Sequence, residues 1–381
     1  MAELVTERAV QPTASQERIQ SEKLYQASQW QLMFWKLKKH RLAIVSGGIL
    51  AFLYLIAIFS PFVAPYRGDR RSEYPNLPPQ KLHLREAQTN TFSLRPFIYG
   101  IEKTRNPKTL ALEFREKLDE KYYLRFFVHG DPYKLWGLIN TDIHLFGVDG
   151  GQQIFLFGTD GLGRDLFSRT ILASTISLSV GLVGVALSFI LGVIIGGISG
   201  YYGGWIDTTI QQIITFLAAL PTIPIWMGLS AAIPGDWPPL KIYFGITLVL
   251  SLIGWTGLAR VVRGRILQLR EEAFVTAARL AGSNNRAIIL GHLVPSFASY
   301  LIVHITLALP GMILGETALS FIGLGLREPV ISWGVLLQAA QNVRSVALYP
   351  WLMIPAIFVI TTTLAFSFLG DGLRDAADPY A

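Results

Sequence analysis

The chain has 381 residues, of which 51% are hydrophobic and only 15% are charged, and its mean hydropathy is +0.41. Because charged residues make up about a quarter of an ordinary soluble domain, this composition excludes such a domain and favours a membrane-embedded chain. The absence of cysteine excludes disulfides, thiolate metal sites and cysteine nucleophiles.

The formal net charge is +7, and the positive residues stand beside hydrophobic runs of membrane length. In a soluble protein this charge would suggest a nucleic-acid partner. Here cytoplasmic flanks and anionic lipid explain it more simply. We therefore expect membrane lipid, and no nucleic acid, as a partner.

Residues 1–41 form a polar, basic tail before the first hydrophobic run. We expect that run to be a retained anchor, because a cleavable signal peptide would begin closer to the N-terminus. Within 21–41, aromatic residues lie beside lysines, and the residues concerned are Trp30, Phe34, Trp35, Lys36, Lys38 and Lys39. An interfacial helix at the inner leaflet would explain this pattern, and so would a basic flank that only fixes orientation; the two explanations are compatible.

Six hydrophobic runs approach or exceed the roughly 20 residues that a helix needs to cross about 30 Å of hydrocarbon. They are 42–64, 174–199, 207–232, 242–260, 297–322 and 349–370. The expected fold class is therefore an all-α membrane protein with six transmembrane helices.

Lysine and arginine are dense before the first run and after the fourth, and sparse in 233–241 and 323–348. By the excess of positive charge in cytoplasmic segments, both termini and the segment 260–295 are expected in the cytoplasm. The chain then divides into a cytoplasmic tail, a first transmembrane helix, an extracytoplasmic insert, a core of five spans and a C-terminal cytoplasmic tail. Their bounds are 1–41, 42–65, 66–157, 158–370 and 371–381.

The outside insert, 66–157, is too long for a simple turn, and its patterns suggest a small α+β unit. Asn106 and Pro107 resemble a helix start, and Leu110, Phe114 and Leu118 follow at intervals of four, so we predict an amphipathic helix over 107–121. Tyr122–Val128, His144–Val148 and Gln153–Phe157 read as short strands. Partner docking and shielding of a pore mouth both fit such a unit.

Residues 158–169 combine glycines with a basic residue just before the second span. A nucleotide-binding loop would need a preceding strand and a Lys-Ser/Thr pair, and the segment has neither. We expect a local turn and helix cap.

Within the spans, Gly192, Gly196 and Gly200 recur every four residues, and Gly204 continues the series. On a helix they form a smooth stripe for close helix packing, and Gly203-Gly204 should end that helix. Prolines interrupt the third and fifth spans, which indicates packing features or kinks along a gated path; they are Pro221, Pro224 and Pro310.

Glu316 and His304 are ionisable groups at membrane depth. Such groups usually face protein or water, and a proton relay would need more of them than the other spans offer. For Glu316 we favour a structural role near the outer face over a role in the path.

The segment 260–295, which is expected in the cytoplasm, has features of an interaction site. Ala273, Ala277 and Ala281 fall on one helical face, and Gly282 with Ser283-Asn284 should end the helix. A short helix with a face of small residues can enter a groove of another protein.

The order Thr276-Ala277-Ala278, Gly282 and Pro295 resembles the "EAA" loop of ABC importer permeases. The usual leading glutamate is Thr276 here, so a salt bridge from that position is not expected. Further segments are similar to the second-permease ("C-type") subunit of the dipeptide and oligopeptide branch. They are 36–41, 158–169, 200–204 with Asp207, 315–325, 332–334 and 371–379.

The resemblance implies the type I (MetI-like) permease fold and transport by alternating access. A solute-binding protein would deliver di- or oligopeptide to the outer face of two homologous permeases, driven by two ABC ATPases, identical or different. Relatives also carry nickel chelates, oligosaccharides and opine-like conjugates. The ATPase-coupling residues it implies are Glu272, Ala273, Thr276, Ala277, Ala278, Gly282 and Pro295.

No phosphate-binding Gly-x-x-x-x-Gly-Lys-Ser/Thr motif occurs in the sequence, so ATP and Mg²⁺ are expected on the partner ATPases, with no cofactor or metal in this chain and no catalytic residue. The location expected is the bacterial inner membrane. An intramembrane hydrolase would need Ser/His or paired Asp in adjoining spans, and a secondary transporter would need several mid-membrane acids and an internal repeat. Isolated candidates such as Glu316 support neither class well.

Overall fold

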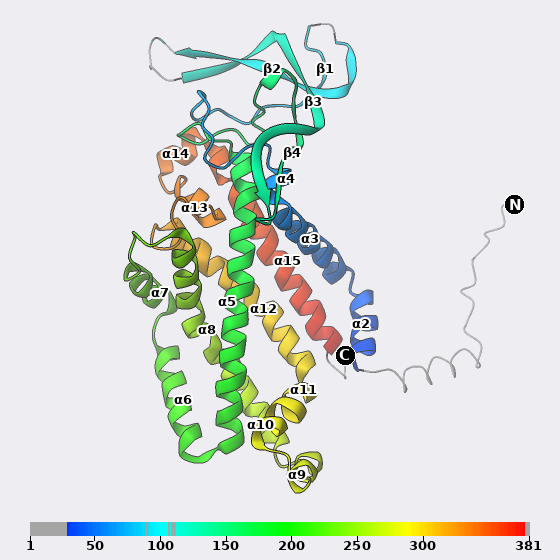
Figure 1. Cartoon of the computed structure of the whole chain (residues 1–381), viewed down its shortest axis with the longest axis vertical. Coiled ribbons are helices and arrows are strands. Elements are labelled where there is room, and N and C mark those ends of the chain that lie inside the picture. The colour runs from blue at the N-terminus through cyan, green and yellow to red at the C-terminus, as the bar shows by residue number, and fades with distance from the viewer. Residues whose placement is uncertain (1–28, 89, 106, 108–111, 378–381) are drawn as a thin grey trace, which may run out of the picture.

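The structure is a computed structural model that describes residues 29–88, 90–105, 107 and 112–377. Long helices run side by side along one axis, a β-sheet covers one end, and a short helix, α9, projects at the other end (Figure 1). The predicted tail residues 1–28, Trp30's side chain and residues 378–381 lie outside what is described.

Among the described residues, five helices are long and apolar enough to cross a membrane on their own. They are α3 (Arg41–Ile58), α5 (Leu166–Tyr202), α8 (Pro239–Leu269), α12 (Ala298–Phe321) and α15 (Ile354–Ala377), which the 3-10 turn η3 (Pro350–Met353) precedes. These five match the first, second, fourth, fifth and sixth predicted runs.

The third predicted span, 207–232, is broken rather than continuous. α6 (Gly204–Ala219) and α7 (Thr222–Ala231) meet at an angle of 88° and count as one span only as a bent pair. Pro221 causes the break: Leu220 before it takes an extended backbone (φ −82°, ψ 139°), as the residue before a proline prefers. Pro224 then lies in the first turn of α7, where a missing N–H costs nothing. Pro310, by contrast, lies inside an uninterrupted α12.

Helix packing follows the glycine stripe. A Cβ built on Gly196 of α5 would lie 2.4 Å from the Ala259 carbonyl oxygen of α8, and one on Gly200 would lie 2.8 Å from the Arg263 carbonyl oxygen. A Cβ on Gly192 would lie 2.9 Å from the side chain of Leu258. The three glycines therefore allow the α5 and α8 backbones to touch, as predicted, and α5 ends at Tyr202 with Gly203 at φ +64°.

α8 also runs nine residues further than its predicted span. Val262 and Ile266 are fully buried, so the packing against α5 continues past Arg260. The expected loop over 260–295 thus begins near Arg270. It contains α9 (Ala273–Leu280), α10 (Asn285–Ala287), the π-helical turn η2 (Ile288–Leu293) and α11 (Val294–Ser296).

The remaining helices border these spans. α2 (Gln29–Lys39) lies within the predicted interfacial segment and contacts α15, and His40 Nε2 lies 3.8 Å from the Asp375 carboxylate. The beginning of the first span and the end of the last therefore lie at the same end of the bundle. At the opposite end lie α4 (Ser60–Val63), α13 (Trp333–Gln338) and α14 (Val343–Leu348).

The insert is an antiparallel four-stranded sheet in the order β1-β2-β3-β4. Its strands are β1 (His83–Arg85), β2 (Phe92–Arg105), β3 (Leu112–Leu135) and β4 (Ile139–Val148), followed by a 3-10 turn, η1 (Asp149–Gly151). Buried Tyr66, Ile98, Phe146 and Ile154 form its small core.

The helix predicted over 107–121 is wrong for the residues described. From Leu112 onward that stretch is β3, paired with β2 from Arg105↔Leu112 to Phe97↔Tyr123. The spacing of four that suggested a helix is also a multiple of two, the repeat of a strand, so Phe114 and Leu118 fit both. Backbone pairing with β2 along this stretch decided the outcome. Strands at Tyr122–Val128 and His144–Val148 are confirmed within β3 and β4, whereas Gln153–Phe157 is irregular.

Candidate functional site

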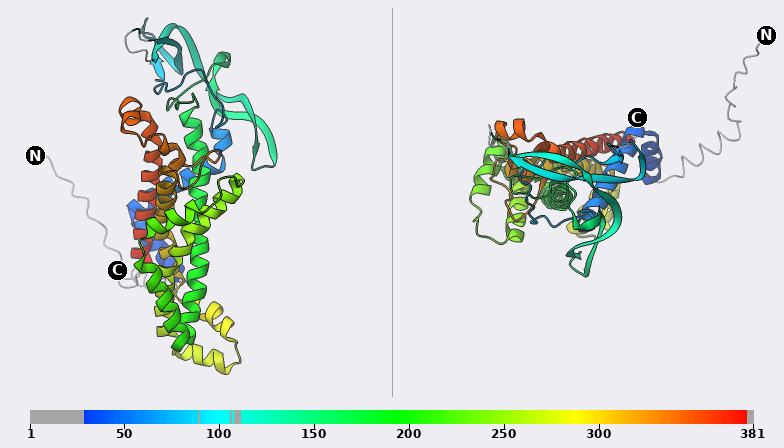
Figure 2. Two further views of the ribbon diagram at one scale, coloured as in Figure 1. Left: turned by 90° about the vertical axis from the view of Figure 1, so that its left-hand side faces the viewer. Right: turned by 90° about the horizontal axis from the view of Figure 1, so that it is seen from above.

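The candidate site is α9, which protrudes at the end of the bundle opposite the sheet (Figure 2). Glu272 precedes it as the N-cap, and the Glu272 carbonyl accepts from the N–H groups of Val275 and Thr276 at 3.1 and 3.2 Å. The expected helix therefore exists, with its start one residue after Glu272.

The end of α9 is closed by a backbone motif that needs glycine. Ser283 N–H donates to the Ala278 carbonyl and Gly282 N–H to the Arg279 carbonyl, both at 3.0 Å, and Gly282 has φ +83°. This is the Schellman arrangement, in which a residue of positive φ satisfies the last carbonyls of a helix. Asn284 then caps α10 by accepting from the Ala287 N–H at 2.8 Å. The predicted helix end is confirmed.

One side of α9 is anchored in the protein. Val275 is fully buried in an apolar cluster with Val262 and Ile266 of α8 and Ile288 and Leu293 of the following segment, and Ala278 packs against it. Pro295 lies in α11, next to this cluster. The anchored side sets the direction in which the other side points.

The other side is open to solvent and mostly apolar. Leu280 is 86% exposed and Phe274 is 43% exposed, and Ala273, Thr276, Ala277 and Ala281 are exposed around them. A soluble surface helix would normally turn such a face inward. Of the predicted coupling residues, the structure thus gathers five on or at the ends of the exposed side, places Ala278 at the anchored side, and leaves Pro295 exposed in α11.

Hydrogen bonds between side chains connect α5, α6 and α8 at this end of the molecule. Asp207 at the start of α6 accepts two hydrogen bonds from the guanidinium of Arg263, both at 2.5 Å, and one from the Ser199 hydroxyl at 2.5 Å. This ties α5, α6 and α8 together directly above the loop. In the sequence, Arg263 is only one of several positive residues that follow the fourth hydrophobic run.

Tyr201 connects α5 with the loop itself. Its hydroxyl donates to Asn285 Oδ1 at 2.9 Å, and the Arg279 guanidinium lies 5.4 Å from its ring centroid. Arg270 donates to the carbonyls of Gly200 and Tyr201 at 3.3 and 3.4 Å. The loop that contains α9 is therefore in direct contact with the adjoining ends of α5 and α8.

Glu316 lies in the C-terminal half of α12 and is fully buried. One carboxylate oxygen, Oε1, accepts from the hydroxyls of Ser320 and Ser332, each at 2.7 Å. Those two serines accept from the backbone N–H groups of Leu326 and Val335. Glu316 therefore organises the loop between α12 and α13, as a structural role requires.

The segment 158–169 forms a turn followed by a helix cap. Asp165 caps α5 by accepting from the Ser168 N–H at 2.7 Å, and burial raises the pKa of the Asp165 carboxyl to about 7. Asp160 accepts from the Leu162 and Arg164 N–H groups at 2.9 and 3.0 Å. The turn and cap are confirmed.

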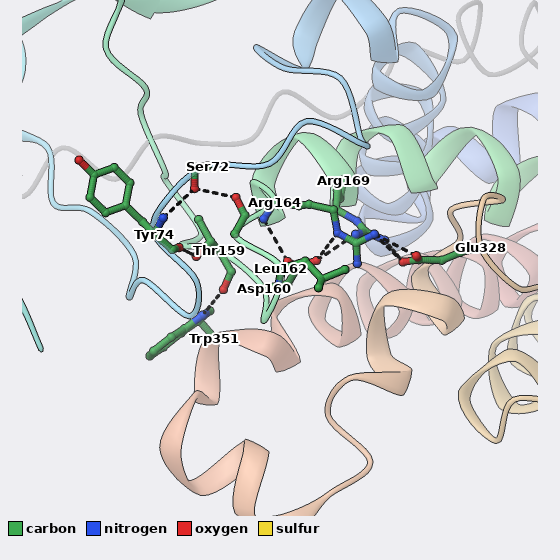
Figure 3. A network of polar contacts seen from close by, with 10 residues as sticks. Ser72, Tyr74, Thr159, Asp160, Leu162, Arg164, Arg169, Glu328 and Trp351 are labelled. Atoms are coloured by element: carbon green, nitrogen blue, oxygen red, sulfur yellow. Dashed lines mark hydrogen bonds and ion pairs between the residues drawn. The ribbon is translucent and has the colours of Figure 1, made fainter. Parts of the chain in front are cut away.

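The same segment also forms a charge network that was not predicted from the sequence. Arg169 lies between Asp160 and Glu328, at 2.9 and 2.6 Å, and Arg164 bridges the same two acids at 2.7 and 2.9 Å (Figure 3). The two guanidinium groups hold the pKa of Glu328 at about 2. Glu328 is more than 150 residues away in sequence, so no local signal indicates this pairing.

Two family models match parts of this chain. A family model described as "Binding-protein-dependent transport system inner membrane component" matches residues 192–380, and one described as "N-terminal TM domain of oligopeptide transport permease C" matches residues 28–79. Among solved structures, an inward-facing MetNI methionine ABC transporter chain is similar, with a TM-score of 0.43 and 16% identity, over 55% of this chain and 97% of that one.

Two relatives are named permeases. The oligopeptide transport system permease protein OppC of Haemophilus influenzae is 42% identical over 58% of this chain and 70% of its own length. The dipeptide transport system permease protein DppC of Bacillus subtilis is 32% identical over 90% of this chain and 83% of its own length. The chain therefore belongs to the binding-protein-dependent ABC importer permease family, in its dipeptide and oligopeptide branch, and is a multi-pass inner-membrane transport subunit rather than an enzyme.

Proposed function

We propose that this chain forms one half of the translocation path for di- and oligopeptides in an ATP-driven importer, and that α9 is the element through which it is driven. The observation that carries the proposal is the two-sided character of α9. Val275 anchors one side, and Phe274, Ala277 and Leu280 expose an apolar side with no covering segment among the described residues.

The partner for this side is an ABC ATPase subunit, which binds the ATP and Mg²⁺. A short helix with small and apolar residues outward fits a cleft in another protein, as in helix-in-groove recognition. Thr276 is exposed on this side, so docking depends on shape and apolar contact rather than on an acid at that position. The peptide substrate is proposed from the names of the relatives.

The complete importer then holds two homologous permeases, two ATPases and an extracytoplasmic solute-binding protein. α9 and both termini face the cytoplasm, because the segments rich in lysine and arginine lie at that end. When the ATPases close, they move α9. Tyr201 and Arg270 then transmit this movement to the inner ends of α5 and α8. Peptide is released when those ends separate.

The test places a charge on the exposed side of α9. Gly282→Asp and Ala277→Asp should each lower ATP-driven peptide uptake by at least about tenfold, a loss of about 1.4 kcal/mol of docking free energy. Co-purification of the ATPases should fall with it, whereas the amount of chain in the membrane should not change.

Gly151→Asp is the matched control, because Gly151 also has positive φ (+70°) and open space around a Cβ, but lies in the sheet insert. It should leave uptake and ATPase binding unchanged. Normal peptide uptake by Gly282→Asp would refute the role of α9.

A further inference from the structure

A second exposed apolar feature lies at the other end of the molecule, on the turn between β3 and β4. We define the hairpin tip as residues 136–139, Trp-Gly-Leu-Ile. Leu138 is 83% exposed, Trp136 is 55% exposed and Ile139 is 53% exposed. Three large apolar side chains on one tight turn are unusual, because turns normally carry small or polar residues.

The backbone conformation of this turn is unfavourable for tryptophan. Trp136 and Gly137 have φ of +52° and +72°, and the Leu138 N–H donates to the Leu135 carbonyl at 3.0 Å, as in a type I′ turn. Asparagine or glycine favours positive φ, whereas a bulky residue such as tryptophan disfavours it. The tryptophan is thus held at the tip against its backbone preference.

The position of the tip is set by the first membrane span. The Trp136 indole N–H donates to the carbonyl of Ile58 at 2.9 Å, and its ring lies 5.4 Å from that of Phe59. Ile58 is the last residue of α3, whose 18 residues span about 27 Å, close to the thickness of the hydrocarbon layer. The tip therefore sits level with the outer boundary of the hydrocarbon.

The surface next to the tip is exposed and apolar. Phe52, Leu55 and Ile58 on α3 are 61%, 54% and 50% exposed, and they lead up to the tip. Seen from above, the β3–β4 hairpin projects beyond the outline of the helices (Figure 2). The apolar face of α3 and the apolar tip form one continuous surface.

Polar residues follow directly behind the tip. Lys134 pairs with Asn140 across the hairpin, and Tyr133 pairs with Thr141. An apolar end with tryptophan, backed by a cation and polar groups, matches the order of acyl chains, interface and headgroups in a bilayer leaflet.

We propose that the hairpin tip inserts into the outer leaflet of the membrane and anchors the sheet insert on the lipid surface. The occupant of this surface is phospholipid, and the anchor holds the insert at a fixed height beside the mouth of the path. This proposal does not depend on the function of α9, which lies at the opposite end of the bundle.

The absence of cysteine allows a direct test. Leu138→Cys, labelled with the polarity-sensitive fluorophore NBD, is reconstituted as the complete transporter in phosphatidylcholine–phosphatidylglycerol vesicles. NBD emission should shift to the blue, and phosphatidylcholine with a spin label high on its acyl chain should quench about half of it. Ile139→Cys should behave alike, and it provides a second site if Leu138→Cys does not assemble.

Leu94→Cys is the matched control, since Leu94 is 91% exposed on β2 of the same insert. Its NBD emission should remain that of a water-exposed label and should not respond to the spin-labelled lipid. If the label at 138 also fails to respond to that lipid, the proposal is wrong. A blue shift at 138 without lipid quenching would assign the tip to a partner subunit and would equally overturn it.

Discussion

The charged side chain of Arg169 is buried, with only 2% of it exposed. A buried guanidinium is tolerated only with close, hydrogen-bonded acids, because removing it from water is costly. Asp160 comes from the turn before α5 and Glu328 from the loop after α12. The pairs therefore join two segments at the end of the bundle that carries the sheet (Figure 1), and no local pattern in the sequence indicates this pairing.

Glu328→Gln should reveal this joint through a pH dependence. Because the pKa of Glu328 in the folded chain, about 2, lies below its value of about 4.3 in an unfolded chain, the ionised acid stabilises the fold above that higher value. This stabilisation is lost as the pH falls toward 2. Since the side chain of Glu328 is 47% exposed, solvent screening limits the effect to about 1 kcal/mol.

The measurement is thermal unfolding of the detergent-solubilised chain at several pH values. Wild type should unfold at a higher temperature than Glu328→Gln at pH 6 to 7, and the difference should shrink below about pH 4. Glu271→Gln is the control, because Glu271 is 73% exposed in its pair with Arg270. A difference that is independent of pH would contradict the assignment to the charge of Glu328.

At the scale of helices and strands, a prediction from the sequence was correct where neighbouring residues determine the structure of the element. The glycine stripe, the break at Gly203 and the end of α9 at Gly282 were predicted, because each follows from the backbone freedom or small size of single residues. The spacing of four between Phe114 and Leu118 led to a wrong prediction of a helix, because this spacing fits both the helix repeat and the strand repeat. Pro221 predicted only a kink, whereas the structure has a bend of 88°, with α7 in contact with α8.

The contact of α5 with α8 makes Gly196 the most sensitive position of the stripe. Gly196→Ala would place a Cβ 2.4 Å from the Ala259 carbonyl oxygen, and backbone cannot move aside as a flexible side chain can. We expect a loss of about 1–3 kcal/mol, seen as a lower unfolding temperature in detergent.

Gly257→Ala on α8 is the control, because no atom lies within 4 Å of its Cβ position. This substitution should leave the free energy of unfolding unchanged or raise it by up to about 1 kcal/mol, since alanine is more favourable than glycine inside a helix. If both variants unfold at the same temperature as wild type, close contact between the two backbones is ruled out.

At the scale of the whole molecule, the two exposed apolar features lie at opposite ends, α9 at one and the sheet insert at the other (Figure 1). A membrane between them places one end in each compartment. The proposed orientation puts Leu280 in the cytoplasm and Leu94 outside, and both leucines are at least 86% exposed.

Single-cysteine labelling checks this orientation with a membrane-impermeant maleimide. In intact cells that make the chain without its ATPases, Leu94→Cys should react and Leu280→Cys should not. Leu280→Cys should react once the membrane is opened, and adding the ATPases should protect it again. Reaction of Leu280→Cys in sealed cells would reverse the topology.

The sequence by itself determined the membrane class, the five unbroken spans, the helix of α9 with its end, and the resemblance to importer permeases. These features rest on hydrophobic runs, glycine spacing and charge density, which are properties of neighbouring residues. Only the tertiary structure decided the sheet, the bent third span, the pairing of Asp207 with Arg263, the network around Arg169 and the place of the hairpin tip beside α3. Each of these joins segments far apart in the chain, so its energy comes from packing and from charges that meet only when the helices are assembled.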